Sequence, residues 1–279
     1  MKTPRKGSFL VYAYNFFMKT VNILLDTLLG DMLHTLTLSK YLYLQDGTKS
    51  NFYHLERVGN KYAVPFEQFH DELKRVLSYQ EYFNSFKRYD ASTDEFEYNI
   101  HHWVYGPYVY KNAFADIMIK SFVGENYTLP HNLKVVDMPI NPKYTNALVI
   151  NRKTDARPEM SPFAEKVYTD IISQFEEKYF IFNQERQYDD FKFKNLVEPL
   201  FVPDLFDMMS IIQGCKLFVG NQSAPLAMAS VMNANRVGEL WYQSLFRDEN
   251  HYSMDADRYD NAEFFDNLSY ITDKKIYLK

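Results

Sequence analysis

The sequence has almost no cysteine and no long apolar run, and each shortage excludes a class of protein. Cys215 is the only cysteine among 279 residues, which excludes an intrachain disulfide and a CxxC metal site and fits a reducing compartment. The nearest candidate for a membrane span, VYAYNFFMKTVNILL, is interrupted by Asn15, Lys19 and Asn22. The N-terminus has basic residues but no clear signal-peptide cleavage site. We therefore expect a cytoplasmic protein without an integral membrane segment.

Several catalytic motifs are also missing. The sequence contains no GxSxG elbow and no GxxxxGK(S/T) loop, so serine hydrolases of that type and P-loop enzymes are excluded. Its seven histidines show neither HxxxH nor HExxH spacing, so no metal site is expected. The formal net charge of −5, with both signs interspersed, argues against a large nucleic-acid surface but leaves room for a local basic groove.

The most informative stretch that is present is KLFVGNQSAPLAMASVM, residues 216–232. Its apolar run is typical of a buried strand, and Ser223 followed by Pro225 is typical of a helix start. The N–H groups of such a first turn point beyond the strand, where the helix dipole favours an anion such as a phosphate. An ordinary strand-to-helix connection is the alternative, and the local pattern does not decide between the two.

A similar unit lies near the start of the chain. NILLDT, residues 22–27, is predicted to be a strand, and Gly30 and Asp31 open a predicted helix, MLHTLTLSKYL. The region from about 50 to 130 is less regular. Further elements are predicted as a helix over 69–83, a strand over 146–151, a helix over 161–178, a strand over 178–183 and a helix over 202–214.

This alternation predicts an α/β protein whose second half has a parallel sheet with helices on both faces. Open α/β sheets bind ligands beyond the carboxyl ends of their strands. If the two halves face each other, Asp31 and the loop at Asn221 border one cleft.

Four segments resemble motifs of the heptosyltransferase-like glycosyltransferases. LLGDMLHTL resembles GDxLHTLP, and GCKLFVGNQSAPLAMAS resembles FIGNDSGPxHLA. Between them, VINRKTDARPE resembles NRSPRYRN and FIFNQERQYDDF resembles FVGxxxEYxxF, as in a bacterial and phage branch of that superfamily. The order and spacing agree over most of the chain after Met18, and the middle of the N-terminal half is only loosely similar.

The resemblance implies a GT-B fold, in which two Rossmann-like domains face a central cleft. Residues 1–140 would form the acceptor-side domain, with 1–17 as an extension. Residues 141–279 would bind the nucleotide-sugar, and the last helix is a candidate to pack back on the first domain. The resemblance further implies no metal or other cofactor, with the nucleotide-sugar as co-substrate. The chain departs from the family pattern at Thr37, Gln222, Ala224 and Ala227, where the family commonly has Pro, Asp, Gly and His.

On the acceptor side, the resemblance favours Asp31 as the general base that takes the proton of the acceptor hydroxyl. The alternative is that Asp31 only stabilises a helix start. His34 follows by three residues and either orients the base, contacts the acceptor or is a buried structural residue. Trp103, next to two histidines, is either an aromatic side chain on which the acceptor stacks or a structural residue of the core and its edge.

On the donor side, two arginines after the strand 146–151 offer bidentate donors to the departing diphosphate, unless they are only solvated or ion-paired. The loop after residue 219 adds a hydroxyl, amide side chains and helix-start N–H groups, and a glutamate at the next strand end can accept from a ribose or base. The alternative for the amide side chains of Asn221 and Gln222 is that they only stabilise the loop through hydrogen bonds to its backbone. The donor-side candidates are Arg152, Arg157, Asn221, Gln222, Ser223, Ala224 and Glu239.

The leading hypothesis is an inverting, metal-independent glycosyltransferase with Asp31 as base. A catalytically degenerate nucleotide-sugar-binding or scaffold protein is the second hypothesis, and a sugar-nucleotide epimerase is the third. The acceptor stays open among a glycan, a lipid-linked molecule, a protein and a nucleic acid.

Overall fold

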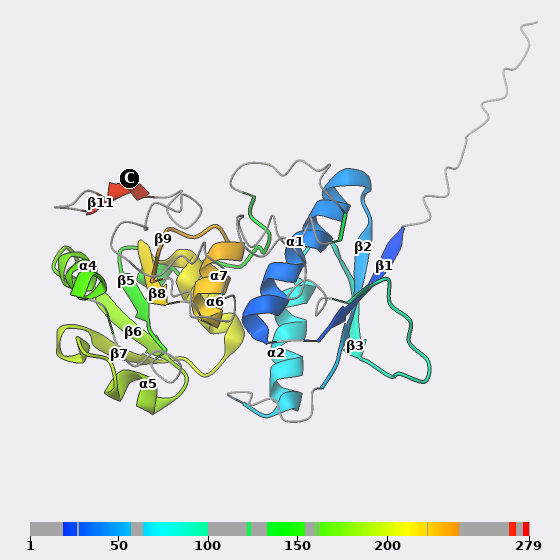
Figure 1. Ribbon diagram of the computed structural model, residues 1–279, viewed down its shortest axis with the longest axis horizontal. Helices are drawn as coiled ribbons and strands as arrows, with labels where there is room; N and C mark the ends of the chain where they lie inside the picture. The colour runs from blue at the N-terminus through cyan, green and yellow to red at the C-terminus, as the bar shows by residue number, and fades with distance from the viewer. Residues whose placement is uncertain are drawn as a thin grey trace, which may run out of the picture.

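The protein has two parallel sheets with helices packed between them and outside them (Figure 1). A computed structural model of the chain describes residues 19–26, 28–56, 64–99, 122–123, 133–153, 160, 162–221, 223–239, 268–271 and 276–278. Among these residues, no helix is both long enough and apolar enough to cross a membrane.

The first half is a Rossmann-like unit with the strand order β3-β2-β1-β4, all parallel. Apolar side chains make β1 a buried strand, and α1 ends at Gly47, which has φ 75° and donates its N–H to the Tyr43 carbonyl. The elements are β1 (Thr20–Leu25), α1 (Leu29–Asp46), β2 (Lys49–His54), α2 (Phe66–Ser78), β3 (Phe83–Arg88) and β4 (Tyr98–Asn99).

The second half is a doubly wound unit with the strand order β7-β6-β5-β8-β9, again all parallel. Its direction of winding reverses between β5 and β8, which makes the carboxyl ends of these two strands the topological switch point. The elements are β5 (Leu148–Asn151), α4 (Pro162–Ile172), β6 (Lys178–Phe182), α5 (Glu185–Asp189), β7 (Glu198–Phe201), α6 (Leu205–Gly214), β8 (Leu217–Asn221), α7 (Ala224–Val231) and β9 (Arg236–Glu239).

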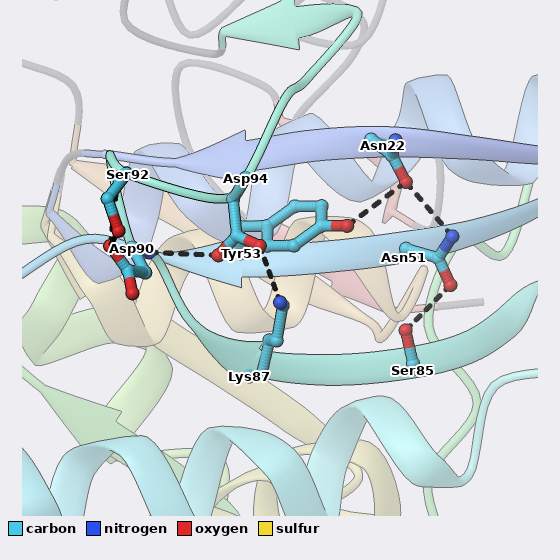
Figure 2. Close-up of polar contacts among 8 residues, drawn as sticks. All are labelled: Asn22, Asn51, Tyr53, Ser85, Lys87, Asp90, Ser92 and Asp94. Atoms are coloured by element: carbon cyan, nitrogen blue, oxygen red, sulfur yellow. Dashed lines mark hydrogen bonds and ion pairs between the residues drawn. The ribbon is translucent and has the colours of Figure 1, made fainter.

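The first sheet has one apolar face, against α1 and α2, and one polar face. Parallel sheets are usually apolar on both faces. Here Asn51 donates to the Asn22 side-chain oxygen at 3.0 Å and accepts from Ser85 at 2.6 Å, so a polar row crosses three strands (Figure 2). Residues 89–97 return from β3 to β4 without a helix, and Asp94 in this connection binds Lys87 of β3 (Figure 2).

A continuous apolar core joins the two halves. It runs from the inner face of the first sheet, through α1, α2, α6 and α7, to Val149, Ile181 and Phe218 of the second sheet. We call this cluster the shared core. A second cluster, which includes Ile150 and Phe180, fills the opposite face of the second sheet under α4. The four helices of the shared core therefore form a double layer between the sheets (Figure 1).

Most predicted elements are confirmed, including the strand at 22–27, the helix after Gly30, the strands at 146–151 and 178–183 and the helix within 202–214. Two helices were predicted too long. The helix over 69–83 ends at Ser78, and the one over 161–178 ends at Ile172. Strands β2, β3 and β7 and the short helix α5 were not predicted.

The described residues near the C-terminus form an antiparallel pair, β10 (Leu268–Ile271) and β11 (Ile276–Leu278). Residues 240–267 and 1–18 lie outside the described residues. The last helix and the extension over 1–17 therefore stay predictions, and so does the domain boundary at residue 140.

Candidate functional site

The switch point of the second sheet is bridged by a buried asparagine. Asn221, the last residue of β8, donates its amide N–H to the Lys153 carbonyl at 2.7 Å and accepts from the Lys153 N–H at 3.0 Å. Its side chain is only 1% exposed. These two bonds connect the end of β8 to the loop after β5. They correspond to loop stabilisation, which the sequence analysis gave as the alternative role of Asn221. A contact of Asn221 with a donor stays a prediction.

Two further residues shape this switch point. A Cβ on Gly220 would lie 2.8 Å from the Phe218 ring and 3.0 Å from the Asn151 carbonyl oxygen, so only glycine fits without a shift. Arg152, directly after β5, is 2% exposed, so a cationic side chain is buried beside the switch point. In the low-dielectric interior its charge acts more strongly on a nearby anion than a solvated charge does.

The first turn of α7 begins at the same edge of the sheet. Ser223 is the N-cap residue, but its hydroxyl donates to the Asn221 carbonyl at 2.9 Å rather than capping a first-turn N–H. Pro225 in this turn has no N–H. Ala224 begins the helix, so the turn presents backbone donors without a capping side chain.

The first turn of α1, from the other half, packs directly against this turn. A Cβ on Gly30 would lie 3.6 Å from the Ala227 Cβ and 3.7 Å from the Ala224 Cα. Asp31 is the next residue, half-buried in the first turn of α1, whose N-cap Leu28 makes no side-chain capping bond. The structure thus brings the helix starts that follow β1 and β8 close together, at a separation that leaves room for about one methyl group.

His34 lies one turn further along α1 and is buried. Burial, and secondarily the positive charge of Arg236 on β9, lowers the pKa of His34 to about 4. The imidazole is therefore neutral near pH 7 and is 7% exposed. This geometry favours the structural alternative for His34, at the contact between α1 and the second half.

The structure describes the remaining predicted site residues only in part. The backbone of Glu239 pairs with Asn221 across β9 and β8, which places it at the same carboxyl edge. The residues Arg157, Gln222 and Trp103 and the side chain of Glu239 lie outside the described residues.

Sequence reasoning missed two buried polar residues at strand ends. Asp26 directly follows β1 and is 7% exposed, and Asn151 ends β5, where it donates to the Ile181 carbonyl at 2.8 Å. The signal was a polar residue immediately after each apolar run, in NILLD and LVIN. Within the described part of the chain, no group of three or more His, Cys, Asp or Glu side chains could hold a metal ion.

No family model and no curated protein matches this sequence. Several solved structures are similar to it in fold, and two of them are described here. The E. coli heptosyltransferase WaaC with ADP-2-deoxy-2-fluoro heptose is 10% identical, covers 83% of this chain and 91% of its own, and has a TM-score of 0.52. The iron-containing dodecameric glycosyltransferase TibC from enterotoxigenic E. coli H10407 is 9% identical, covers 92% of this chain and 70% of its own, and has a TM-score of 0.52.

At such low identity the likeness concerns the fold alone. The two parallel sheets with packed helices agree with this fold, so the predicted fold class, α/β GT-B with two Rossmann-like halves, is confirmed. The phage or bacterial branch and the motif assignments stay predictions.

Proposed function

We propose that the protein is a glycosyltransferase that moves a sugar from a nucleotide-sugar to an acceptor hydroxyl. One observation carries the proposal. The first turn of α1, with Asp31, and the first turn of α7 meet at the carboxyl ends of two parallel sheets, with Gly30 against Ala224 and Ala227. That is where open α/β sheets bind ligands, and the shared fold with a heptosyltransferase and a glycosyltransferase supports a sugar-transfer reaction.

In the proposed reaction, the acceptor oxygen attacks the anomeric carbon from the side opposite the leaving group, which inverts the configuration. The new carbon–oxygen bond forms as the bond to the diphosphate breaks, and Asp31 takes the proton of the acceptor hydroxyl. The diphosphate leaves with the bonding electron pair. No metal is required in this scheme, because backbone donors and cations stabilise the developing charge.

Donor binding is proposed at the switch point of the second sheet. The first-turn amides of α7 are proposed to bind the diphosphate there, and the charge of Arg152 favours an anion from inside the fold. In the proposal, the hydroxyl of Ser223 exchanges its bond to the Asn221 carbonyl for one to a phosphate oxygen. Arg157 adds a second guanidinium in the proposal. Asn221, Gln222 and Glu239 are proposed to contact the sugar or ribose, and Trp103 is proposed to lie on the acceptor side. The buried His34 is assigned a structural role behind the first turn of α1.

A second candidate is a nucleotide-sugar-binding protein without turnover. Ala227 favours it, because this position is 6% exposed and its methyl group packs against α1, so no titratable side chain serves the donor there. Release of the donor's nucleotide by the purified protein, a nucleoside diphosphate or CMP from a CMP-sugar, separates the two candidates, since a binding protein without turnover releases none. We also propose a cytoplasmic location, because a single unpaired cysteine, Cys215, suits a reducing compartment.

The first experiment is a thermal-shift screen against UDP-, GDP-, ADP- and CMP-sugars, because only a ligand that binds the folded state raises its stability. The second compares Asp31→Asn with Asp71→Asn, an exposed carboxylate on α2 that serves as the matched control. We expect D31N to lose about 10²–10⁴-fold in diphosphate release while it keeps the thermal shift. Equal activity in both variants rules out Asp31 as the base.

A further inference from the structure

The contact between the two halves has the composition of a protein interior. Relative motion of two domains is the default unless their interface is large and hydrophobic. Here the shared core contains side chains of both sheets, and α1 packs on α7 while α2 packs on α6. Opening the halves along this layer would expose that core to water, which opposes the motion.

A carboxylate of the first half caps a helix of the second. Glu72 of α2 is 7% exposed, and its Oε2 accepts the N–H of Leu205, the first residue of α6, at 3.0 Å. Its Oε1 accepts from Gln68 at 2.7 Å. A negative group at a helix start satisfies an otherwise unpaired N–H and complements the helix dipole. Glu72 can accept the Leu205 N–H only while the two halves keep their present relative orientation.

The next turns of α2 hold the same end of α6. Arg75 binds Asp204, the N-cap residue of α6, at 2.7 Å, and its guanidinium lies 4.7 Å from the centre of the Phe206 ring. Tyr79 packs against Phe206 with ring centroids 5.1 Å apart. These exposed contacts add little energy each, but they fix the register of α2 on α6.

The segment that connects the halves is bonded to both of them. Gln80, after α2, donates to the Asp137 carbonyl at 3.0 Å and accepts from the Asp137 N–H at 2.8 Å. The N–H groups of Val135 and Val136 both donate to the carbonyl of Val231 in α7, at 2.8 and 3.0 Å. A hinge needs backbone dihedrals that are free to change, and these bonds restrain the segment.

We propose that the two halves form one rigid unit, held by the shared core and by the clamp of Glu72, Arg75 and Gln80, and that ligands bind and leave without rotation of one half against the other. The inference is independent of the proposed function, because it concerns the protein with or without a donor. It assigns Glu72 the role of a positioning residue that sets where α6, and with it the second half, lies.

Distance measurements between two spin labels test the proposal. Cys215 is buried and burial raises the pKa of its thiol to about 12, so labels attach to introduced cysteines and not to it. Suitable exposed positions are Gln45 at the end of α1 and Thr169 on α4. We expect one narrow distance distribution in the ligand-free protein, and a shift of less than about 2 Å with UDP-, GDP-, ADP- or CMP-sugars.

A broad or two-peaked distribution without ligand, or a larger shift with any of these sugars, overturns the proposal. The ligand-free measurement decides even if no donor binds, so a failure of the proposed function does not affect it. This result needs only the doubly labelled protein with no other substitution, so it does not depend on whether a Glu72 variant folds.

A variant series tests the clamp. Glu72→Ala leaves the Leu205 N–H without its acceptor, and we expect it to broaden the distance distribution and to lower Tm by roughly 2–10 °C. Glu72→Gln keeps an acceptor oxygen and should restore the narrow distribution. Asp71→Ala, the neighbouring exposed carboxylate, should change neither quantity. An unchanged distribution in E72A removes Glu72 from the clamp.

Discussion

Mild acid should destabilise the protein through two buried histidines. The pKa of His34 is lowered to about 4 by burial and the charge of Arg236, and that of His54 to about 3 by burial, His70 and Arg88. An unfolded histidine has a pKa of about 6.5. Below pH 6.5 the unfolded chain therefore binds protons that the folded chain does not, so the free energy of unfolding falls as the pH falls toward the folded-state values.

The magnitude between pH 7 and pH 5.5 depends almost only on the unfolded-state pKa, because both folded-state values lie well below this window. Each histidine then contributes a loss of about 1.2 kcal/mol, or about 2.5 kcal/mol together. Urea denaturation at the two pH values measures the loss.

Two variants assign that loss to its sources. His34→Gln and His54→Phe should each reduce the difference between the two pH values by about 1.2 kcal/mol, whatever they do to the absolute stability. His54→Phe suits its site, since His54 is enclosed by the rings of Phe66, Phe69 and Phe86. If H34Q keeps the full wild-type difference, His34 is not neutral in the folded protein and the reasoning fails.

Three further predictions concern backbone positions and the switch point. Gly220→Ala should destabilise by about 1–3 kcal/mol, because its Cβ would lie 2.8 Å from an aromatic ring, whereas Gly30→Ala meets only an ordinary 3.6 Å contact and should cost less than about 1 kcal/mol. Thermal denaturation of the pair measures the contrast, and equal Tm values contradict the geometry. Asn221→Ala should cost about 1–3 kcal/mol in urea denaturation, because it removes both bonds to Lys153, and a neutral result argues against the bridge. Gly47→Ala should cost about 1 kcal/mol or more, because φ is 75° there, while Gly47→Asn, which tolerates that conformation, should cost less in the same assay.

The two strand, loop and helix units were predictable because their signals are local. In each, an apolar run long enough for a strand is followed within a few residues by Gly-Asp or Ser-Ala-Pro, and both α1 and α7 begin there. The resemblance of these segments to one superfamily then indicated the fold. The closeness of Gly30 and Ala227 could not be predicted from local sequence patterns, because about 200 residues separate them and only the packing of four helices brings them together.

Strands β2 and β3 escaped prediction because one face of their sheet is polar. A parallel strand buried on both faces has a continuous apolar run. KSNFYH and FNSFKR instead place Asn51, Tyr53, Ser85 and Lys87 on the outer face, where they bind one another or the connection to β4 (Figure 2). The end of α2 was missed for a different reason, since the side chain of Gln80 that follows it bonds to the distant Asp137.

The shared core also limits how this protein can diversify. Two-domain enzymes are often treated as modules, in which the half that recognises one substrate is replaced by a homologous half with another preference. Here a replacement half would arrive with its own side chains against α1 and α2, and these side chains would have to fit a core to which both sheets contribute. We therefore expect substrate specificity to change through point substitutions in the loops at the strand ends. A chimera of two such proteins should fold only if all four helices between the sheets are transferred together.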